Sequence, residues 1–242
     1  MQTGFNMQSI DASWQTIIQQ ALSTVEPHYM EQLHKNPNWL PGQDKIFNAF
    51  SLPLAQTEYI LFGESPYPRA ESANGYAFWD ANVGDIWTET GLSKPVNRAT
   101  SLRNILKMLL VADNQLMPSD TSQAAIAKTD KSNYIHSLAE LFENMQRHGI
   151  LLLNASLVLS QNKVQYDAKH WRPFMAELLQ QIALTKPDIK LILLGNIAKE
   201  INKFTATKQF DCFYSEHPYN VSFINNPQVL EFFGPFHLLE KS

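Results

Sequence analysis

The sequence of 242 residues has only one cysteine, Cys212. A single thiol forms neither an internal disulfide nor a cysteine-based zinc or iron–sulfur site. No apolar run approaches the roughly 18 residues of a membrane span. Residues 1–14 also lack the apolar stretch of a signal peptide. The formal net charge is −4, without the basic excess that is typical of nucleic-acid-binding domains. We therefore expect a cytoplasmic protein in which any contact with nucleic acid comes from local groups.

The composition is that of a folded chain, since 44% of the residues are hydrophobic and 17% are charged. Disordered chains are poorer in apolar residues and richer in charge. At about 150 residues per domain, the length allows one large domain or two small ones. Because the sequence has neither a repeat nor a low-complexity linker, we predict one domain over residues 1–242. We expect a helical extension over 1–35 and a surface excursion over 112–133.

Short apolar segments alternate with amphipathic ones along the chain. The apolar segments predict strands at 58–63, at the start of 149–160, at 190–195 and within 210–218. Helical spacing predicts helices over 10–32, 100–111, 172–184 and 196–204, the first capped by Asp11 or Ser13 and the second by Thr100 or Ser101. This alternation predicts an α/β fold, a three-layer α/β/α sandwich around a mostly parallel four-stranded sheet. Ligands in such folds bind beyond the carboxyl ends of the strands, so we expect the site to follow Gly63, Asn154 and the strand before Glu216.

Seven short motifs lie at these strand ends and between them: GESPYP (63–68), GYAF (75–78), TSLRNI (100–105), LLLN (151–154), GN (195–196), HPYNVS (217–222) and FFGPFH (232–237). In this order and spacing they resemble the motifs of the uracil-DNA glycosylase superfamily, and the chain is most similar to its first family. The resemblance covers residues 36–242. It implies an enzyme of base excision repair that flips deoxyuridine out of DNA and hydrolyses its N-glycosidic bond, without a metal or organic cofactor.

The resemblance implies that three residues bind the flipped uracil. Phe78 stacks on the base, and the amide of Asn154 matches the N3–H and O4 groups that cytosine presents in the opposite pattern. Tyr67 lies against C5, where thymine has a methyl group. His217 donates a hydrogen bond to O2 as negative charge develops there, an interaction worth roughly 3–4 kcal/mol. Each residue type also has an ordinary structural role, as a core aromatic, a turn-capping amide, a loop tyrosine or a packed histidine.

Further matched positions imply contacts with DNA. Ser101 and Ser222 match residues that bind backbone phosphates, which fixes position rather than sequence. Gly195 and Asn196 match a Gly-Ser loop of the family. Val221 falls where the family inserts a leucine into the duplex, and the shorter valine predicts weaker flipping. The expected partner is DNA that contains deoxyuridine, in single- or double-stranded form, bound by a monomer without contact with a membrane.

The motif GESPYP diverges from the family's water-activating motif, Gly-Gln-Asp-Pro-Tyr-His. Ser65 stands where the family has a catalytic aspartate, and a serine orients water without supplying negative charge. Pro68 replaces the final histidine. Glu64 stands where the first family has glutamine, and it resembles the Gly-Glu opening of the iron–sulfur branch of the superfamily. We therefore expect slow catalysis by His217, Ser65 and Glu64, with Glu64 positioning the water.

Three functions agree with these residues. The first is a slow glycosylase for uracil in DNA. The second is a catalytically inactive DNA-binding or scaffold protein on the same fold, which the loss of the aspartate and the acidic composition favour. The third is a glycosylase for another damaged base, since Tyr219 and Asn220 stand where the family has a Ser-Pro pair, in the segment that begins at His217.

Overall fold

The computed structural model describes residues 5–160 and 164–241, so the ends of the predicted 1–242 domain lie outside the described residues. The chain divides into two compact units. Unit 1 comprises Met1–Ala81, Gly149–Leu193 and Ile197–Phe213, and unit 2 comprises Asn82–His148, Leu194–Asn196 and Tyr214–Ser242. Each unit is therefore assembled from segments that are far apart in the sequence.

The four-stranded sheet is built by the apolar segments that the sequence predicts as strands. Across the sheet the order is β4 (Ile150–Asn154), β1 (Tyr59–Gly63), β5 (Lys190–Leu194) and β6 (Asp211–Ser215). β1 pairs in parallel with β4 on one side and with β5 on the other. β4 is buried along its whole length, as expected for a strand that is covered on both faces. The predicted α/β class with a mostly parallel sheet is thus confirmed. α8 (Ile197–Ile201) follows β5 and is shorter than the helix predicted over 196–204.

The N-terminal part of unit 1 forms two helices where the sequence predicts one helix over residues 10–32. The observed elements are a 3-10 turn at Ala12–Trp14, α1 (Gln15–Ser23) and α2 (Pro27–Lys35). Pro27 lacks an N–H, so it is tolerated in the first turn of a new helix but would interrupt a continuing one. The predicted cap at Asp11 is confirmed for the 3-10 turn, because its carboxylate accepts hydrogen bonds from the backbone N–H and the hydroxyl of Ser13.

α7 (Val164–Thr185) is longer than the helix predicted over 172–184, and Pro173 lies inside it. A proline is common in the first turn of a helix, which explains the shorter prediction. The turns before Pro173 carry Asp167 and Trp171, both with 0% exposure. Their tertiary contacts stabilise helix where local propensity disfavours it.

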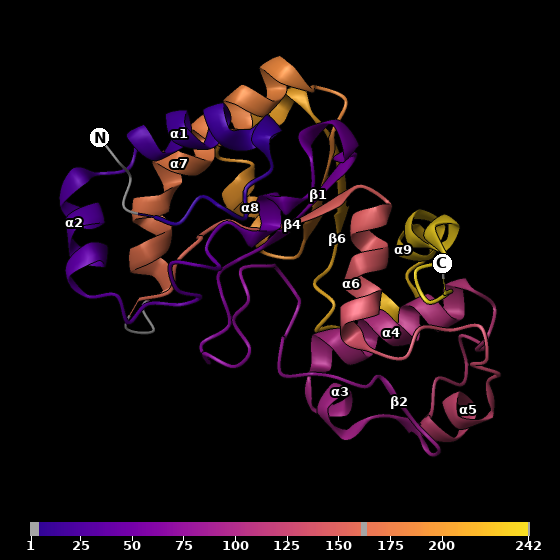
Figure 1. The fold of residues 1–242 in the computed structure, drawn as a ribbon. Helices are drawn as coiled ribbons and strands as arrows, with labels where there is room; N and C mark the ends of the chain where they lie inside the picture. The colour runs from indigo at the N-terminus through magenta and orange to yellow at the C-terminus, as the bar shows by residue number, and fades with distance from the viewer. Residues whose placement is uncertain (1–4, 161–163, 242) are drawn as a thin grey trace. The chain divides into compact units, whose positions relative to one another are not determined.

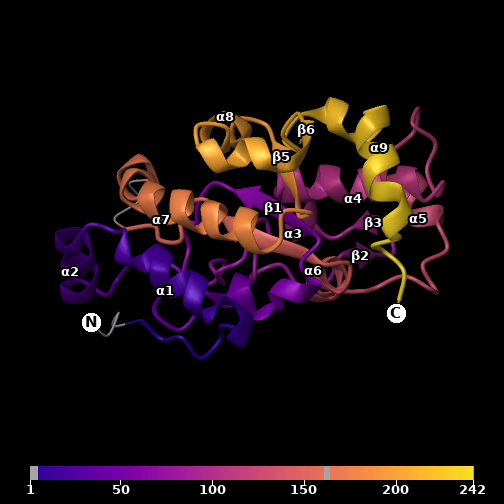
Figure 2. The same ribbon diagram turned by 90° about the horizontal axis from the view of Figure 1, so that it is seen from above.

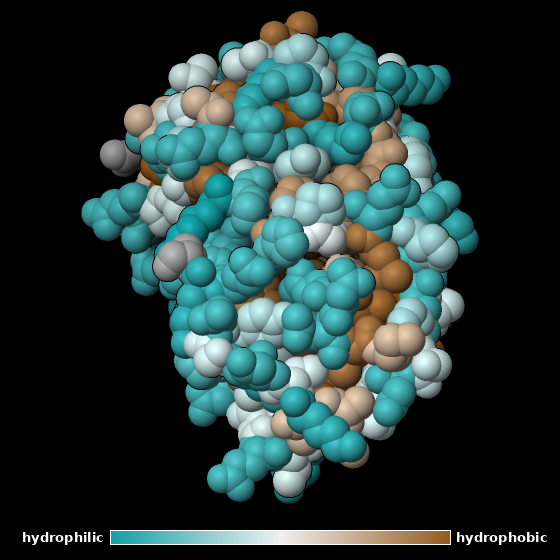
Figure 3. Space-filling view, turned by 90° about the vertical axis from the view of Figure 1, so that its right-hand side faces the viewer, coloured by the Kyte–Doolittle hydropathy of each residue, from teal (hydrophilic) through white to brown (hydrophobic). Residues whose placement is uncertain are grey.

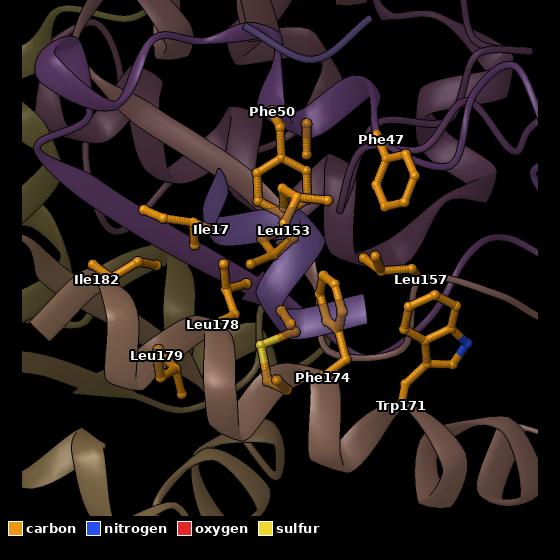
Figure 4. Close-up of a cluster of buried hydrophobic side chains, with 14 of the residues drawn as sticks. Ile17, Phe47, Phe50, Leu153, Leu157, Trp171, Phe174, Leu178, Leu179 and Ile182 are labelled. Carbon is orange, nitrogen blue, oxygen red and sulfur yellow. The ribbon is translucent and has the colours of Figure 1, made fainter. Parts of the chain in front are cut away.

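The core of unit 1 forms between α1, α7 and the sheet. α1 and α7 run side by side in both ribbon views (Figures 1 and 2). Figure 4 shows Ile17 of α1, Phe174 and Leu178 of α7, and Leu153 of β4 in one buried cluster. Burying each such side chain contributes roughly 1.5–3 kcal/mol relative to leaving it exposed. The sheet is therefore a rigid support for the loops that follow its strands.

Unit 2 is mainly helical in its described residues. Its elements are α3 (Lys94–Arg98), α4 (Thr100–Ala112), α5 (Gln123–Lys128), α6 (Leu138–Arg147) and α9 (Pro227–Phe233), with the short strands β2 (Trp87–Thr88) and β3 (Gly91–Leu92). α4 confirms the helix predicted over 100–111. Its N-cap, however, is Ala99, which makes no side-chain hydrogen bond, so the cap predicted at Thr100 or Ser101 is wrong. Both residues lie inside the first turn, which leaves the helix start without a side-chain cap.

The face of the molecule that Figure 3 shows is mainly polar. Hydrophilic side chains cover most of the face in Figure 3, and hydrophobic ones form separate patches. No helix in residues 5–160 and 164–241 combines the length and the apolar character that crossing a membrane requires.

Candidate functional site

Asn154 lies at the carboxyl end of β4, where the parallel register places it opposite Gly63 of β1. The pairing continues past both strands, because the backbone N–H groups of Ala155 and Ser156 donate to the carbonyls of Gly63 and Glu64 at 2.9 and 3.0 Å. Only 3% of Asn154 is exposed. The sheet therefore holds this amide at the edge where ligands bind in such folds.

Gly63 leaves the space that the side chain of Asn154 occupies. A Cβ added at Gly63 would lie 2.5 Å from Oδ1 of Asn154 and 2.8 Å from Cβ of Ala77. Real Cβ atoms essentially never approach another heavy atom within 3.0 Å. Asn154 and Ala77 can thus both approach the end of β1 only because residue 63 is glycine.

Phe78 follows Ala77 in a segment that is tied to β4. The N–H of Ala77 donates to the carbonyl of Leu152 at 3.1 Å. Phe78 itself has a φ of +62°, in the left-handed region that bulky residues rarely adopt. Such a conformation costs about 1–3 kcal/mol and is concentrated at functional sites. Phe78 is half-buried and is not among the residues of the hydrophobic core cluster.

Tyr67 is linked to the Phe78 segment by its hydroxyl, which donates to the backbone carbonyl of Phe78 at 3.1 Å. The two loops are linked a second time, because Arg69 and Asp80 form an ion pair with an N–O distance of 3.1 Å. Burial, assisted by the carboxylate of Asp80, raises the pKa of Tyr67 to about 12. The hydroxyl therefore stays protonated at neutral pH and remains a hydrogen-bond donor.

Glu64 and Ser65 follow β1 directly. The side chain of Glu64 is exposed, and that of Ser65 is half-buried beside the buried Pro66. A serine hydroxyl can donate and accept a hydrogen bond but has no charge, whereas an ionised glutamate accepts only and supplies one negative charge. Of these two neighbouring residues, only Glu64 can therefore supply a negative charge.

His217 lies in unit 2, two residues after the end of β6. Its Nδ1 accepts a hydrogen bond from the backbone N–H of Tyr219 at 3.1 Å. In a neutral imidazole one ring nitrogen accepts and the other donates, so this contact assigns the proton to Nε2. The half-buried ring therefore presents an N–H donor at Nε2, the group needed to stabilise a developing oxyanion.

The backbone around His217 is held at two points within unit 2. The N–H of Gly195 donates to the carbonyl of Ser215 at 2.8 Å, and a Cβ at Gly195 would lie 2.6 Å from Cβ of His217. The buried side chain of Asn104 donates to the carbonyl of Pro218 at 2.8 Å. Neither role is predicted by the sequence. The available signal for Asn104 was its place in the TSLRNI motif, and the signal for Gly195 was its place in GN.

The residues predicted to contact DNA also lie in unit 2. Ser101 is in the first turn of α4, where backbone N–H groups lack a side-chain cap. Val221 begins a 3-10 turn and is 70% exposed, an unusual exposure for an aliphatic side chain. Ser222, which follows it, and Asn196, which follows Gly195, are exposed.

The structure thus brings part of the predicted site together at the ends of β1 and β4 in unit 1, namely Glu64, Ser65, Tyr67, Phe78 and Asn154. The other predicted residues belong to unit 2, namely Ser101, Gly195, Asn196, His217, Val221 and Ser222. Among the described residues, no group of three or more His, Cys, Asp and Glu side chains could hold a metal ion.

The comparison with protein families gives one match that covers most of the chain. The model of the Uracil DNA glycosylase superfamily matches residues 51–233. The chain therefore belongs to the uracil DNA glycosylase superfamily.

Individual relatives agree with this assignment. The chain is 25% identical over 193 residues to the uracil-DNA glycosylase of Streptococcus mutans, an alignment that covers 79% of this chain and 74% of the relative. The wild-type UNG crystal structure from Nitratifractor salsuginis is 43% identical, with a TM-score of 0.92 over 97% of this chain and 94% of that one. The mimivirus uracil-DNA glycosylase, at 16% identity and a TM-score of 0.60, covers 89% of this chain and 72% of its own and shares the fold alone.

Proposed function

We propose that this protein is a DNA glycosylase that hydrolyses the N-glycosidic bond of deoxyuridine in DNA, as in base excision repair. The observation that supports this best is the buried amide of Asn154, held at a strand end opposite a glycine. Its oxygen accepts from uracil N3–H and its NH₂ donates to O4. Cytosine presents the reverse pattern, and each buried polar group left unpaired costs about 1–3 kcal/mol.

In this proposal the ring of Phe78 stacks on the flipped base and Tyr67 excludes thymine. Stacking on an aromatic ring contributes roughly 1–3 kcal/mol and does not discriminate among bases. Discrimination at C5 requires a rigid barrier, because a mobile ring would move away from the thymine methyl group. The hydrogen bond from Tyr67 to the carbonyl of Phe78 and the Arg69–Asp80 ion pair provide that rigidity.

Hydrolysis breaks the bond between C1′ of the sugar and N1 of uracil, and the electron pair leaves with the base. His217 donates from Nε2 to O2 of the departing uracil, where negative charge develops. The oxygen of a water molecule bonds to C1′ and loses its proton to Glu64, and a proton from solvent neutralises the uracil anion. Ser65 orients the water. The products are free uracil and an abasic site.

We assign the chain to the first family of the superfamily, with GESPYP as a divergent form of its water-activating motif. Without a negative charge at Ser65, the positive sugar of the transition state loses stabilisation of a few kcal/mol, which corresponds to a factor of hundreds or more in rate. We therefore propose slow turnover that depends on the exposed carboxylate of Glu64.

The DNA backbone is bound by groups on unit 2. Ser101 and Ser222 bind phosphates with their hydroxyls, assisted by free N–H groups at the start of α4. Gly195 and Asn196 contact the DNA backbone, and the exposed Val221 enters the duplex beside the flipped nucleotide. We propose that a monomer acts on single- or double-stranded DNA in the cytoplasm, a compartment that agrees with a sequence that has only one cysteine, Cys212.

The test is an excision assay under single-turnover conditions. Purified protein, expressed in a host without glycosylases of its own, is mixed in excess with a labelled oligonucleotide that contains one deoxyuridine. Alkali then cleaves any abasic site. The matched oligonucleotides contain deoxycytidine or thymidine at the same position.

Cleavage of the deoxyuridine strand alone, reduced about 100-fold or more by His217→Ala, would support the proposal. Absence of cleavage by an excess of folded protein would contradict it. Binding to DNA with a non-cleavable deoxyuridine analogue would then identify an inactive binding protein, and release of another damaged base would identify a different glycosylase.

A further inference from the structure

We propose that Asn104 is a positioning residue that fixes the proton of His217 on Nε2. The inference rests on the proposed function, because it explains how His217 becomes a hydrogen-bond donor toward uracil O2. Asn104 touches neither substrate nor the reacting atoms in this proposal. It acts on the backbone of the loop of residues 217–220, the His217 loop.

The tautomer of His217 is set by a hydrogen bond within its own loop. Nδ1 of His217 accepts the N–H of Tyr219, which lies two residues further along the chain. The same loop is closed by a second bond, in which the N–H of Asn220 donates to the carbonyl of His217 at 2.9 Å. The tautomer therefore depends on the backbone conformation of the loop, since the N–H of Tyr219 reaches Nδ1 only when the loop folds back.

Asn104 holds the His217 loop in that conformation. A loop that folds back directs its carbonyls to one side. The Nδ2 of Asn104 lies 2.8 Å from the carbonyl oxygen of Pro218 and 3.4 Å from those of Tyr219 and Asn220. One amide thus faces the carbonyl oxygens of three consecutive residues, with its strongest bond to Pro218.

Asn104 is itself held rigidly. It lies in the second turn of α4, a helix of 13 residues, and only 1% of it is exposed. α4 also contacts the 3-10 turn Val221–Asn225, which follows the loop directly. A buried amide on a packed helix cannot follow a moving loop, so its bond to Pro218 restrains the loop rather than the reverse.

Unit 2 contains a matched control. Asn144 of α6 is also a buried asparagine, 5% exposed, and its Nδ2 donates to the carbonyls of Leu238 and Glu240 at 3.0 and 2.8 Å. Asn144→Ala removes the same kind of contact from a segment that contains no proposed catalytic residue. It should therefore lower stability as Asn104→Ala does, without changing His217.

The experiment measures the ring nitrogens of His217 by ¹⁵N NMR in full-length protein labelled on histidine, with His217→Gln to assign its signals. In the wild type, Nδ1 should be unprotonated and Nε2 protonated. In Asn104→Ala and in the nearly isosteric Asn104→Asp, both nitrogens should shift toward a mixture of tautomers. Asn104→Asp preserves the volume of the side chain but places a carboxylate against carbonyl oxygens, so it tests the inference if the alanine variant fails to fold.

The kinetic readout separates positioning from binding. Both Asn104 variants should lower the single-turnover excision rate about 10- to 100-fold, because small displacements of a reacting group are enough to produce such losses. The Kd for DNA with a non-cleavable deoxyuridine analogue should change less than about threefold, since Tyr67, Phe78 and Asn154 are unaltered.

Unchanged ring signals and an excision rate within twofold of wild type in folded Asn104→Asp would overturn the inference. Equal effects of Asn144→Ala and Asn104→Ala on His217 would also overturn it, because they would show only general destabilisation. The NMR result does not require activity. A wild-type protein without excision would thus contradict the proposed function while the ring signals still test the role of Asn104.

Discussion

Replacing Gly63 by alanine should disable uracil recognition through one misplaced methyl group. The new Cβ would lie 2.5 Å from Oδ1 of Asn154, about 0.9 Å closer than ordinary van der Waals contact, and 2.8 Å from Cβ of Ala77. Both neighbours are held by backbone hydrogen bonds at the strand ends, so neither can move away freely. The Asn154 amide must therefore shift or rotate, and it loses the geometry that matches N3–H and O4.

The size of the effect follows from this overlap. Overpacking of this kind costs typically about 1–3 kcal/mol. For a chain of this length, that lowers the midpoint of thermal unfolding by roughly 2–12 °C. A displacement near 1 Å at a recognition group can reduce the rate about 100-fold. The excision rate should therefore fall far more than the small loss of stability explains.

The assay combines thermal unfolding with single-turnover excision of uracil at a temperature well below the midpoint. Gly84→Ala is the matched control, because a Cβ at Gly84 would meet no atom within 4 Å. Gly84→Ala should retain the wild-type rate. If Gly63→Ala excises uracil as fast as the wild type, Asn154 is not the group that recognises the base, and the reasoning is refuted.

Three other perturbations have defined outcomes. Burial raises the pKa of the Tyr67 hydroxyl from 10.0 to about 12. The contribution of the protonated hydroxyl to the free energy of unfolding is therefore complete below pH 10 and is lost as the pH rises from 10 to 12. Over that range the free energy of unfolding, measured with denaturant, should fall by about 3 kcal/mol more for wild type than for Tyr67→Phe. Glu64→Gln should abolish the single-turnover activity that Ser65→Ala leaves, since only the carboxylate of Glu64 accepts the water proton in the proposed mechanism. Arg69→Ala should lower stability by about 1 kcal/mol, because Asp80 is only 5% exposed, and should weaken binding of a non-cleavable deoxyuridine analogue severalfold.

Each of these predictions has an internal control. Equal pH profiles for Tyr67→Phe and wild type would show that Tyr67 titrates normally. Glu71→Gln changes another exposed carboxylate of the same loop and should leave excision unaltered, whereas full activity of Glu64→Gln would exclude Glu64 as the base. Lys35→Ala removes an exposed ion pair with Glu31 and should change stability by only a few tenths of a kcal/mol, less than Arg69→Ala.

The predicted strands agree with the structure because burial on both faces requires continuous apolar runs such as LLLN. The helix predicted over 100–111 also agrees with the structure, since its apolar residues repeat at helical spacing. Two of the errors occurred where a proline decided the outcome. Pro27 begins a new helix whereas Pro173 lies inside one, and local sequence does not distinguish these cases. The contacts of Asp167 and Trp171 with residues far away in the chain decide the second case.

The candidate site likewise has some features that the sequence predicts and others that it does not. The sequence proposes Tyr67, Phe78, Asn154 and His217 for the site, because they lie in motifs that resemble those of the superfamily. The left-handed backbone conformation of Phe78 could not be predicted from the sequence, since nothing in its neighbours forces a positive φ. The need for glycine at residue 63 could not be predicted either, because it depends on Asn154, which lies opposite it in the sheet.

The sequence by itself determined the class of fold, the superfamily and the residues proposed for the site, because these depend on local pattern and residue type. Only the tertiary structure decided how those groups are held. Gly63 makes room for Asn154, Tyr67 is tied to the backbone of Phe78, and Asn104 faces a loop more than 110 positions later in the chain. Such contacts join segments that are adjacent only after folding, so no local pattern encodes them.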